Sequence, residues 1–266
     1  MIAIDACNPS RGVLNRLAAW QGEVDAHRKP YAKHIDTADE AFARRRRAVD
    51  FASVSELLRA LCSGVRRCMY CQDSGGVDVE HYRPKAWYPE LVFAWANFLL
   101  ICTRCNRKKS SRFPLFHPKA PAVRVLTRAK GTAPRRPPAA DPVLLNPRFD
   151  DPSRYLTLDL LGTFHFVERG AKGTAPWLRA HHTIETLELN DDDLPRARRN
   201  AYDSFLSHLR LAAGARQAAN AAEERRIRGA VGASPCSVVW REMLAQQANI
   251  PELRDAFVAF PDALRW

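Results

Sequence analysis

The sequence contains no hydrophobic run long enough to cross a membrane. Its longest apolar stretch, residues 91–101, is interrupted by Asn97, whereas a membrane-spanning helix needs about 20 apolar residues. The start of the chain lacks the basic residues and the apolar core of a secretory signal peptide. We therefore expect a cytoplasmic protein. Internal repeats are also absent, which argues against a repeat architecture.

Cysteine occurs in an odd number, seven residues, and no export signal accompanies it. Disulfide frameworks belong to oxidising compartments, so none is expected here. Four of the cysteines form two C-x-x-C pairs, a pattern that is more typical of metal binding. We interpret the other three, Cys7, Cys62 and Cys236, as small, partly buried hydrophobic residues.

Lysine is scarce, because only eight of the 41 basic residues are lysines. Against 29 acidic residues the chain still carries a formal net charge of +12. A basic protein of this kind suits a polyanion such as nucleic acid, since neutralised phosphates release their counterions. The chain is also rich in alanine and proline, so a GC-rich genome is an alternative source of the arginine. The charge supports a nucleic-acid site without identifying one.

The spacing of apolar residues predicts an α+β protein that is mainly helical. Leu14, Leu17 and Val24 recur at helical spacing, and residues 155–167 alternate about a turn as a β-hairpin does. Further helices are predicted near 183–187, 194–213 and 238–248. No motif indicates the role of residues 220–266. The predicted segments are a helical region (1–62), a motif-bearing core (63–116), a loop or linker rich in proline and arginine (117–142), and the hairpin with C-terminal helices (143–266).

Two cysteine pairs frame the motif-bearing core. Cys68-x-x-Cys71 is followed, after thirty residues, by Cys102-x-x-Cys105. Four thiolates from two such pairs make a closed tetrahedral Zn²⁺ site, which is structural rather than catalytic. The gap exceeds the roughly 15–20 residues of a simple zinc ribbon, so another unit must fold between the pairs. A redox role and four unrelated buried cysteines are the alternatives.

The unit between the cysteine pairs contains a glutamate next to a histidine. Val77 and Val79 alternate as in a strand, and Glu80 and His81 follow near its expected end. A carboxylate binds hard cations such as Mg²⁺, and an imidazole takes a proton from water near neutral pH. Glu80 and His81 are therefore candidates for a metal ligand and a general base. Ordinary surface polarity is the alternative for an isolated pair.

Two asparagines follow this pair. Asn97 lies in an apolar stretch, where a buried amide needs hydrogen-bond partners, and it could lock the loop that carries His81. Asn106 directly follows Cys105 at the expected start of a basic helix. Attachment to the zinc would fix its position, as a second Mg²⁺ ligand requires. A plain helix N-cap is the alternative for Asn106.

These residues resemble the signature of the HNH endonuclease family in an H-N-N form, made by His81, Asn97 and Asn106. The resemblance implies a ββα-metal core, in which a two-stranded hairpin and a helix surround one catalytic Mg²⁺ or Mn²⁺. It implies that His81 is the general base, that Glu80 and Asn106 hold the metal, and that Asn97 orients the histidine loop. Glu80 replaces the commoner aspartate.

A narrower resemblance extends over about residues 68–200. The chain is similar there to the HNH subunit of Septu antiphage systems (PtuB-like proteins), which is also found beside some retrons. That resemblance implies an effector nuclease that works with an ABC/SMC-like (PtuA-like) ATPase. The matching words are E-H-Y-R-P-K, W-x-N-x-L-L-x-C-x-x-C-N-x-x-K, R-F-P-L, Leu144-Leu-Asn-Pro147, Asp150-Asp-Pro152 and Thr183-Ile-Glu-Thr-Leu-Glu-Leu-Asn190.

The implied reaction is hydrolysis of a phosphodiester bond in nucleic acid, with DNA favoured. Basic residues near the expected centre are candidates for contacts with flanking phosphates. A zinc-dependent DNA-binding module without catalysis and a scaffold subunit of such a complex are the alternatives. The candidate phosphate contacts are Lys85, Arg104, Arg107, Lys108, Lys109 and Arg112.

Overall fold

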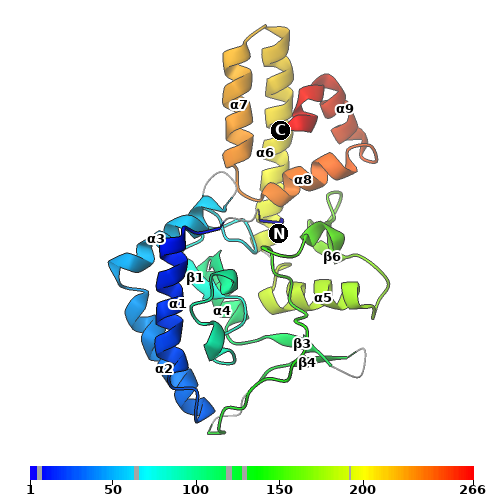
Figure 1. Ribbon diagram of the computed structural model, residues 1–266. Helices are drawn as coiled ribbons and strands as arrows, with labels where there is room; N and C mark the ends of the chain where they lie inside the picture. Colours follow the sequence, from blue (N-terminus) through cyan, green and yellow to red (C-terminus); the bar gives the residue numbers. More distant parts are fainter. Residues whose placement is uncertain (5–7, 63–65, 118–121, 128–130, 192) are drawn as a thin grey trace.

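The computed structural model describes residues 1–4, 8–62, 66–117, 122–127, 131–191 and 193–266. Over these residues the protein is mainly helical, and its strands form two-stranded antiparallel sheets (Figure 1). The prediction of a mainly helical α+β protein is thereby confirmed. None of the described helices combines the length and the apolar character that a membrane span requires.

The described part of residues 1–62 forms three helices, where the apolar spacing predicts a helical region. They are α1 (Arg11–Asp25), α2 (Tyr31–Arg45) and α3 (Val49–Ala60). Their inner faces present aromatic rings to one another: Phe42 lies edge-on to Phe51, with ring centroids 5.7 Å apart, and Trp20 stacks on Phe51. These rings form the surface against which the next unit packs, because Phe51 also contacts Phe98.

That next unit is a strand pair followed directly by a helix. β1 (Asp78–His81) pairs antiparallel with β2 (Phe98–Ile101), and α4 (Thr103–Lys109) begins right after β2. Between the strands the chain makes two single turns, η1 (Pro89–Leu91) and η2 (Trp95–Asn97). All four residues of β2 are buried, since α3 covers one side of the pair.

Two further strand pairs follow. β3 (Pro114–Phe116) pairs with β4 (Val123–Val125), and after η3 (Pro152–Arg154) β5 (Leu156–Leu158) pairs with β6 (Phe166–Glu168). The second pair is the predicted hairpin, with shorter strands than expected. Its connection is longer than a tight turn because the Asp159 carboxylate accepts hydrogen bonds from the backbone N–H groups of residues 161–163.

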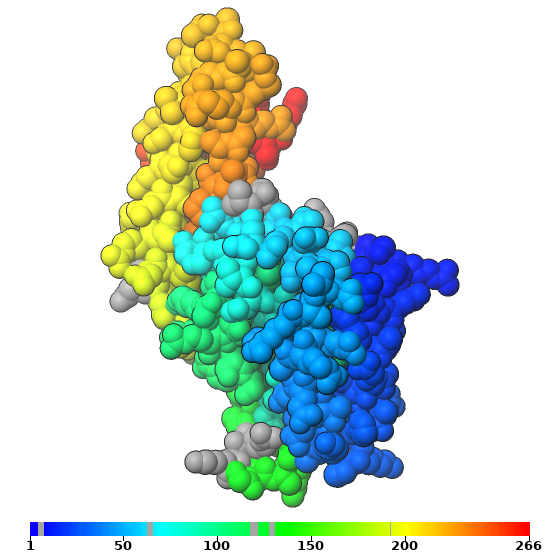
Figure 2. Space-filling view, turned by 90° about the vertical axis from the view of Figure 1, so that its left-hand side faces the viewer, coloured from blue at the N-terminus to red at the C-terminus, as the bar shows by residue number. Residues whose placement is uncertain are grey.

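From residue 175 onward, the described residues form helices joined by short turns. This part contains α5 (Ala175–Leu187), α6 (Asp193–Gln217), α7 (Ala221–Ala233), α8 (Ser237–Gln246), α9 (Pro251–Ala259) and η4 (Pro261–Arg265). Helices α5, α6 and α8 correspond to the three predicted ones, whereas α7 and α9 had no sequence prediction. Helices α6 and α7 rise together as a projection from the rest of the molecule (Figures 1 and 2).

The buried side chains form one continuous cluster to which all four predicted segments contribute. A charged residue is buried as well: Arg198 of α6 has no exposed surface. The guanidinium donates to the carbonyls of Phe164 and Leu189 and lies over the Phe166 ring. Arg198 therefore ties the β5–β6 pair to the start of α6.

Candidate metal centre and active site

The four cysteines of the two C-x-x-C pairs converge in the structure. Their sulfur atoms all lie within 4.8 Å of one another, and all four side chains are buried. Cys71 Sγ and Cys102 Sγ are 3.8 Å apart. A tetrahedral zinc with Zn–S bonds of about 2.3 Å requires sulfur atoms about 3.8 Å apart. The cluster therefore fits a metal ion such as zinc.

The chain brings these sulfurs together from two places. Cys68 and Cys71 lie in the turns before β1, while Cys102 caps the N-terminus of α4 and Cys105 lies in its first turn. Burial raises the pKa of Cys68, and hydrogen bonding with Cys102 raises the pKa of Cys105. Four thiolates in this space would repel one another without a cation, so the arrangement favours a bound divalent metal.

The remaining cysteines stand apart from the cluster. Cys236 is buried, and burial raises the pKa of its thiol to about 12. Cys62 is half-buried and donates to the Leu58 carbonyl. The interpretation as a small, partly buried residue is confirmed for Cys62, and Cys236 is buried more deeply than expected, whereas Cys7 lies outside the described residues.

The cysteine cluster is joined to the C-terminal helices by Gln72, the residue after Cys71. Gln72 has a left-handed backbone, with φ of 62°. Its Oε1 accepts from the backbone N–H of Val238 and from the Ser237 hydroxyl at 3.1 and 3.3 Å. The Gln72 carbonyl also accepts from the N–H of Cys236. This side chain therefore caps the N-terminus of α8.

Polar side chains fill the space between β1 and α4. Asn106 Nδ2 donates to Asp78 Oδ2 at 3.1 Å. Lys109 Nζ donates to Glu80 Oε1 at 2.7 Å and to the His81 carbonyl at 2.8 Å. Asp78 and Glu80 share a face because side chains alternate along a strand. The two predicted metal ligands, Glu80 and Asn106, thus lie at the same β1–α4 interface.

His81 points into an aromatic environment. Its ring centroid lies 4.5 Å from that of Phe42 and 5.3 Å from that of Phe98. His81 Nε2 lies 2.8 Å from the Val92 carbonyl, and since a carbonyl only accepts, Nε2 carries the proton and Nδ1 the lone pair. Burial lowers the pKa of His81 to about 4. In the part of the chain that the structure describes, His81 makes no hydrogen bond to Asn106.

Asn97 is buried and fully bonded. Its Oδ1 accepts from the N–H of Arg83 at 2.7 Å, and its Nδ2 donates to the carbonyls of Arg83 and Leu91 at 3.0 and 3.1 Å. The Asn97 carbonyl accepts from the N–H of Tyr82. One amide therefore holds the chain on both sides of the loop between β1 and β2.

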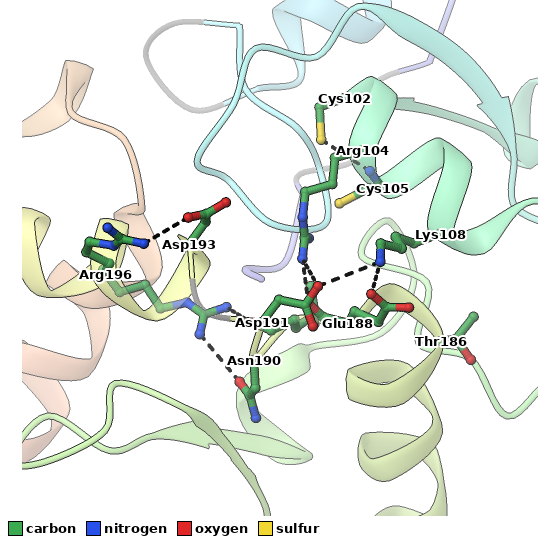
Figure 3. A network of polar contacts seen from close by, with 12 residues as sticks. Cys102, Arg104, Cys105, Lys108, Thr186, Glu188, Asn190, Asp191, Asp193 and Arg196 are labelled. Atoms are coloured by element: carbon green, nitrogen blue, oxygen red, sulfur yellow. Dashed lines mark hydrogen bonds and ion pairs between the residues drawn. The ribbon is translucent and has the colours of Figure 1, made fainter.

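The predicted phosphate contacts differ in how they are placed. Arg104 and Lys108 contact Glu188 and Asp191 just after α5 (Figure 3). Arg112 donates to the Thr186 carbonyl of α5, and Lys85 pairs with Asp39. Arg107 is exposed. Lys109 requires a correction, because its side chain has no exposed surface and binds Glu80 instead of reaching out to a phosphate.

Sequence reasoning missed Asp78. It lies two residues before Glu80, and the alternation of side chains in a strand was the available signal, since it places both carboxylates on one face. The motif in the sequence is the adjacent pair Glu80 and His81, which does not include Asp78. Asp78 matters because it receives the Asn106 amide.

The motifs at residues 144–152 and 183–190 are held together by hydrogen bonds and an ion pair. Leu145 N–H donates to Thr183 Oγ1 at 2.9 Å, and Arg179 pairs with Asp150 at 2.6 Å. Asn190 bonds both the N–H and the carbonyl of Phe166, at 2.8 and 2.9 Å. These residues hold α5 and the β5–β6 pair in place, which is a scaffold role.

Comparison with known proteins finds that the chain is similar to two Septu proteins. The chain is 34% identical over 139 residues to the Septu protein PtuB of Bacillus mycoides, covering 46% of this chain and 43% of that one. It is 27% identical over 132 residues to the Septu protein PtuB of Bacillus thuringiensis, covering 48% and 38%. The matched region thus spans less than half the length of each relative. No protein-family model and no solved structure matches the chain. The resemblance to PtuB-like proteins is confirmed.

Proposed function

We propose that this chain, which resembles Septu PtuB proteins over about half its length, is the metal-dependent HNH endonuclease of a Septu-type antiphage system. The observation that supports this most is the antiparallel β1–β2 pair leading directly into α4, with the cysteine cluster at the junction. The HNH resemblance implies this order of elements. The proposed reaction is hydrolysis of phosphodiester bonds in nucleic acid, with DNA as the favoured substrate.

Glu80 and Asn106, with Asp78 beside them, would hold the catalytic cation. All three carry the side-chain oxygens that Mg²⁺ and Mn²⁺ prefer. The Asn106 Nδ2 is engaged by Asp78, which leaves the Asn106 Oδ1 for a metal. Lys109 engages one oxygen of Glu80, which leaves the other. When bound, the cation supplies charge stabilisation at the scissile phosphate and the leaving 3′-oxygen.

His81 is the proposed general base. Its bond to the Val92 carbonyl fixes the tautomer, so Nδ1 is the atom that takes a proton from the attacking water. The lowered pKa keeps the ring unprotonated at neutral pH, which is the form a base needs, although it also weakens the base. Asn97 would act as a positioning residue by holding the loop that follows His81.

Five basic side chains would contact phosphates on either side of the scissile bond. Arg107 and Arg112 are exposed, and Lys85, Arg104 and Lys108 are partly exposed. A PtuA-like ATPase partner and a cytoplasmic location belong to the same proposal. Both rest on the likeness to the Septu proteins.

The test is cleavage of linear and circular DNA, and of RNA, with Mg²⁺ or Mn²⁺, by the chain alone and with a PtuA-like ATPase. His81→Ala should abolish cleavage while zinc content and circular dichroism stay unchanged. Because His81 is buried, Glu80→Gln and Asn106→Ala provide a second route to the same result. His165→Ala, in the β5–β6 connection, is the matched control. Full cleavage by all three site variants would exclude the catalytic assignment.

A non-catalytic DNA-binding or scaffold subunit is the second candidate. It is favoured by the enclosure of His81 between Phe42 and Phe98 and by the pairing of Glu80 with Lys109. Its mark would be salt-sensitive DNA binding that does not respond to substitution of Glu80 or His81. Absence of cleavage by the complex with the ATPase would favour it further.

A further inference from the structure

The basic side of α4 meets an acidic corner, defined here as Glu188 and Asp191 between α5 and α6. Arg104 Nη2 donates to Asp191 Oδ2 and to the Glu188 carbonyl, each at 2.9 Å. Lys108 Nζ binds Glu188 Oε2 and lies 3.7 Å from Asp191 Oδ2. Figure 3 shows Arg104 and Lys108 of α4 directed at this corner. Two cations and two carboxylates therefore neutralise one another.

The backbone at the corner is unusual. Glu188 caps the C-terminus of α5 in a left-handed conformation, with φ of 48° and ψ of 52°. Glycine and asparagine are the usual residues there, because a Cβ is unfavourable in that conformation. The backbone conformation of Glu188 is therefore energetically unfavourable, and its carboxylate binds Lys108.

The network is open to solvent. The side chains of Arg104 and Lys108 are 28% and 37% exposed, and those of Asp191 and Glu188 are 46% and 33% exposed. Ion pairs at this depth contribute little to folding stability. The same guanidinium and ammonium groups bind carboxylates and phosphates through the same hydrogen bonds. A nucleic-acid backbone and the acidic corner would therefore compete for them.

We propose that Glu188 and Asp191 set the affinity for nucleic acid by occupying the phosphate-binding groups of Arg104 and Lys108. The inference rests on the proposed nuclease function. A cation that is already paired inside the protein gains less from a phosphate, because it must give up its own carboxylate. The corner thus limits binding by the free chain, and a phosphate backbone must displace the carboxylates to use both cations.

The test is the binding of a short DNA duplex to the full chain, followed by fluorescence anisotropy over a series of salt concentrations without added divalent cation. E188Q/D191N keeps the shape of both side chains and removes their charge. We expect binding to tighten on the order of tenfold at low salt. Two freed cations should steepen the slope of log K against log salt by about 1.8, at about 0.9 for each phosphate contact.

The matched control is E223Q/E252Q. It makes the same change in net charge and also frees two arginines, Arg226 and Arg210, on the projecting helices α7 and α6. We expect its affinity to stay within about twofold of the wild type, with an unchanged slope. In E188Q/D191N, adding Arg104→Ala and Lys108→Ala should remove the gain. If the double variant folds poorly, D191N alone should give about half the change in slope.

An equal gain in the control would overturn the inference, because it would show a general effect of net charge. Unchanged binding by E188Q/D191N, with a wild type that binds and cleaves DNA, would overturn the inference and leave the nuclease proposal standing. Absence of binding by the wild type and every variant would count against both.

Discussion

Lys109 and Glu80 form an ion pair inside the protein, with Nζ and Oε1 2.7 Å apart. The Lys109 side chain has no exposed surface, and that of Glu80 is 15% exposed. The same ammonium also binds the His81 carbonyl. One lysine of α4 thus fixes both the proposed metal ligand and the backbone of the proposed base.

Lys109→Met should therefore destabilise the protein strongly. Removing one partner of a buried ion pair leaves the other charge without compensation, at a cost of about 3–5 kcal/mol. Urea unfolding measures the change. Lys108→Met is the control, because its pair with Glu188 is partly exposed and should contribute under about 1 kcal/mol. Equal stability of the two variants would contradict this account of the buried pair.

The burial of Lys109 shows what a sequence cannot supply. Within the run Arg107-Lys108-Lys109 the three residues look alike, and only the position of α4 against β1 decides which one is enclosed. The surroundings of His81 depend in the same way on Phe42, which lies in a helix far away in the sequence. Long-range packing of this kind leaves no local pattern.

Features that depend on the spacing of residues in the sequence could be predicted. Two C-x-x-C pairs predict a four-sulfur cluster, and the described structure brings the four sulfurs together. The β5–β6 hairpin follows from alternation about a turn. Helix α7 was missed because Ile227 and Val231 are its buried apolar residues, and the rest of the helix is alanine, glycine and charged residues.

Loss of one cysteine from the cluster that we propose to hold zinc should unfold the core. Cys105→Ser removes a thiolate from a closed site whose apparent metal-binding free energy is on the order of 10–16 kcal/mol, and the β1–β2–α4 unit depends on that junction. Zinc content and the melting temperature should both fall sharply. Cys62→Ser, outside the cluster, should change neither. A Cys105→Ser protein with full zinc and an unchanged melting temperature would refute the assignment.

Gln72→Leu should loosen α8 without lowering the zinc content that we expect for the cysteine cluster. The substitution removes the hydrogen bonds from Oε1 to the start of α8, and loss of a helix N-cap costs about 1 kcal/mol. Hydrogen exchange of the Val238 amide should quicken. Gln217→Leu, at the exposed end of α6, is the control. Unchanged protection at Val238 would mean that Gln72 does not couple the cysteine cluster to α8.

Asp78→Ala should weaken metal binding more than it weakens folding. The Asp78 carboxylate holds the Nδ2 end of the Asn106 amide, which leaves Oδ1 for the cation, and without Asp78 the amide is free to turn. Loss of a residue that orients a metal ligand typically lowers affinity about 10–100-fold.

Titration of Mn²⁺ followed by electron paramagnetic resonance measures this without requiring cleavage. Asp203→Ala, an exposed acid on α6, makes the same change in charge away from the site and should leave Mn²⁺ binding as it is. A restored affinity in Asp78→Glu would separate the orienting role from a general loss of structure. If Asp78→Ala binds Mn²⁺ as the wild type does, the cation is held elsewhere, and the roles given to Glu80 and Asn106 fall with it.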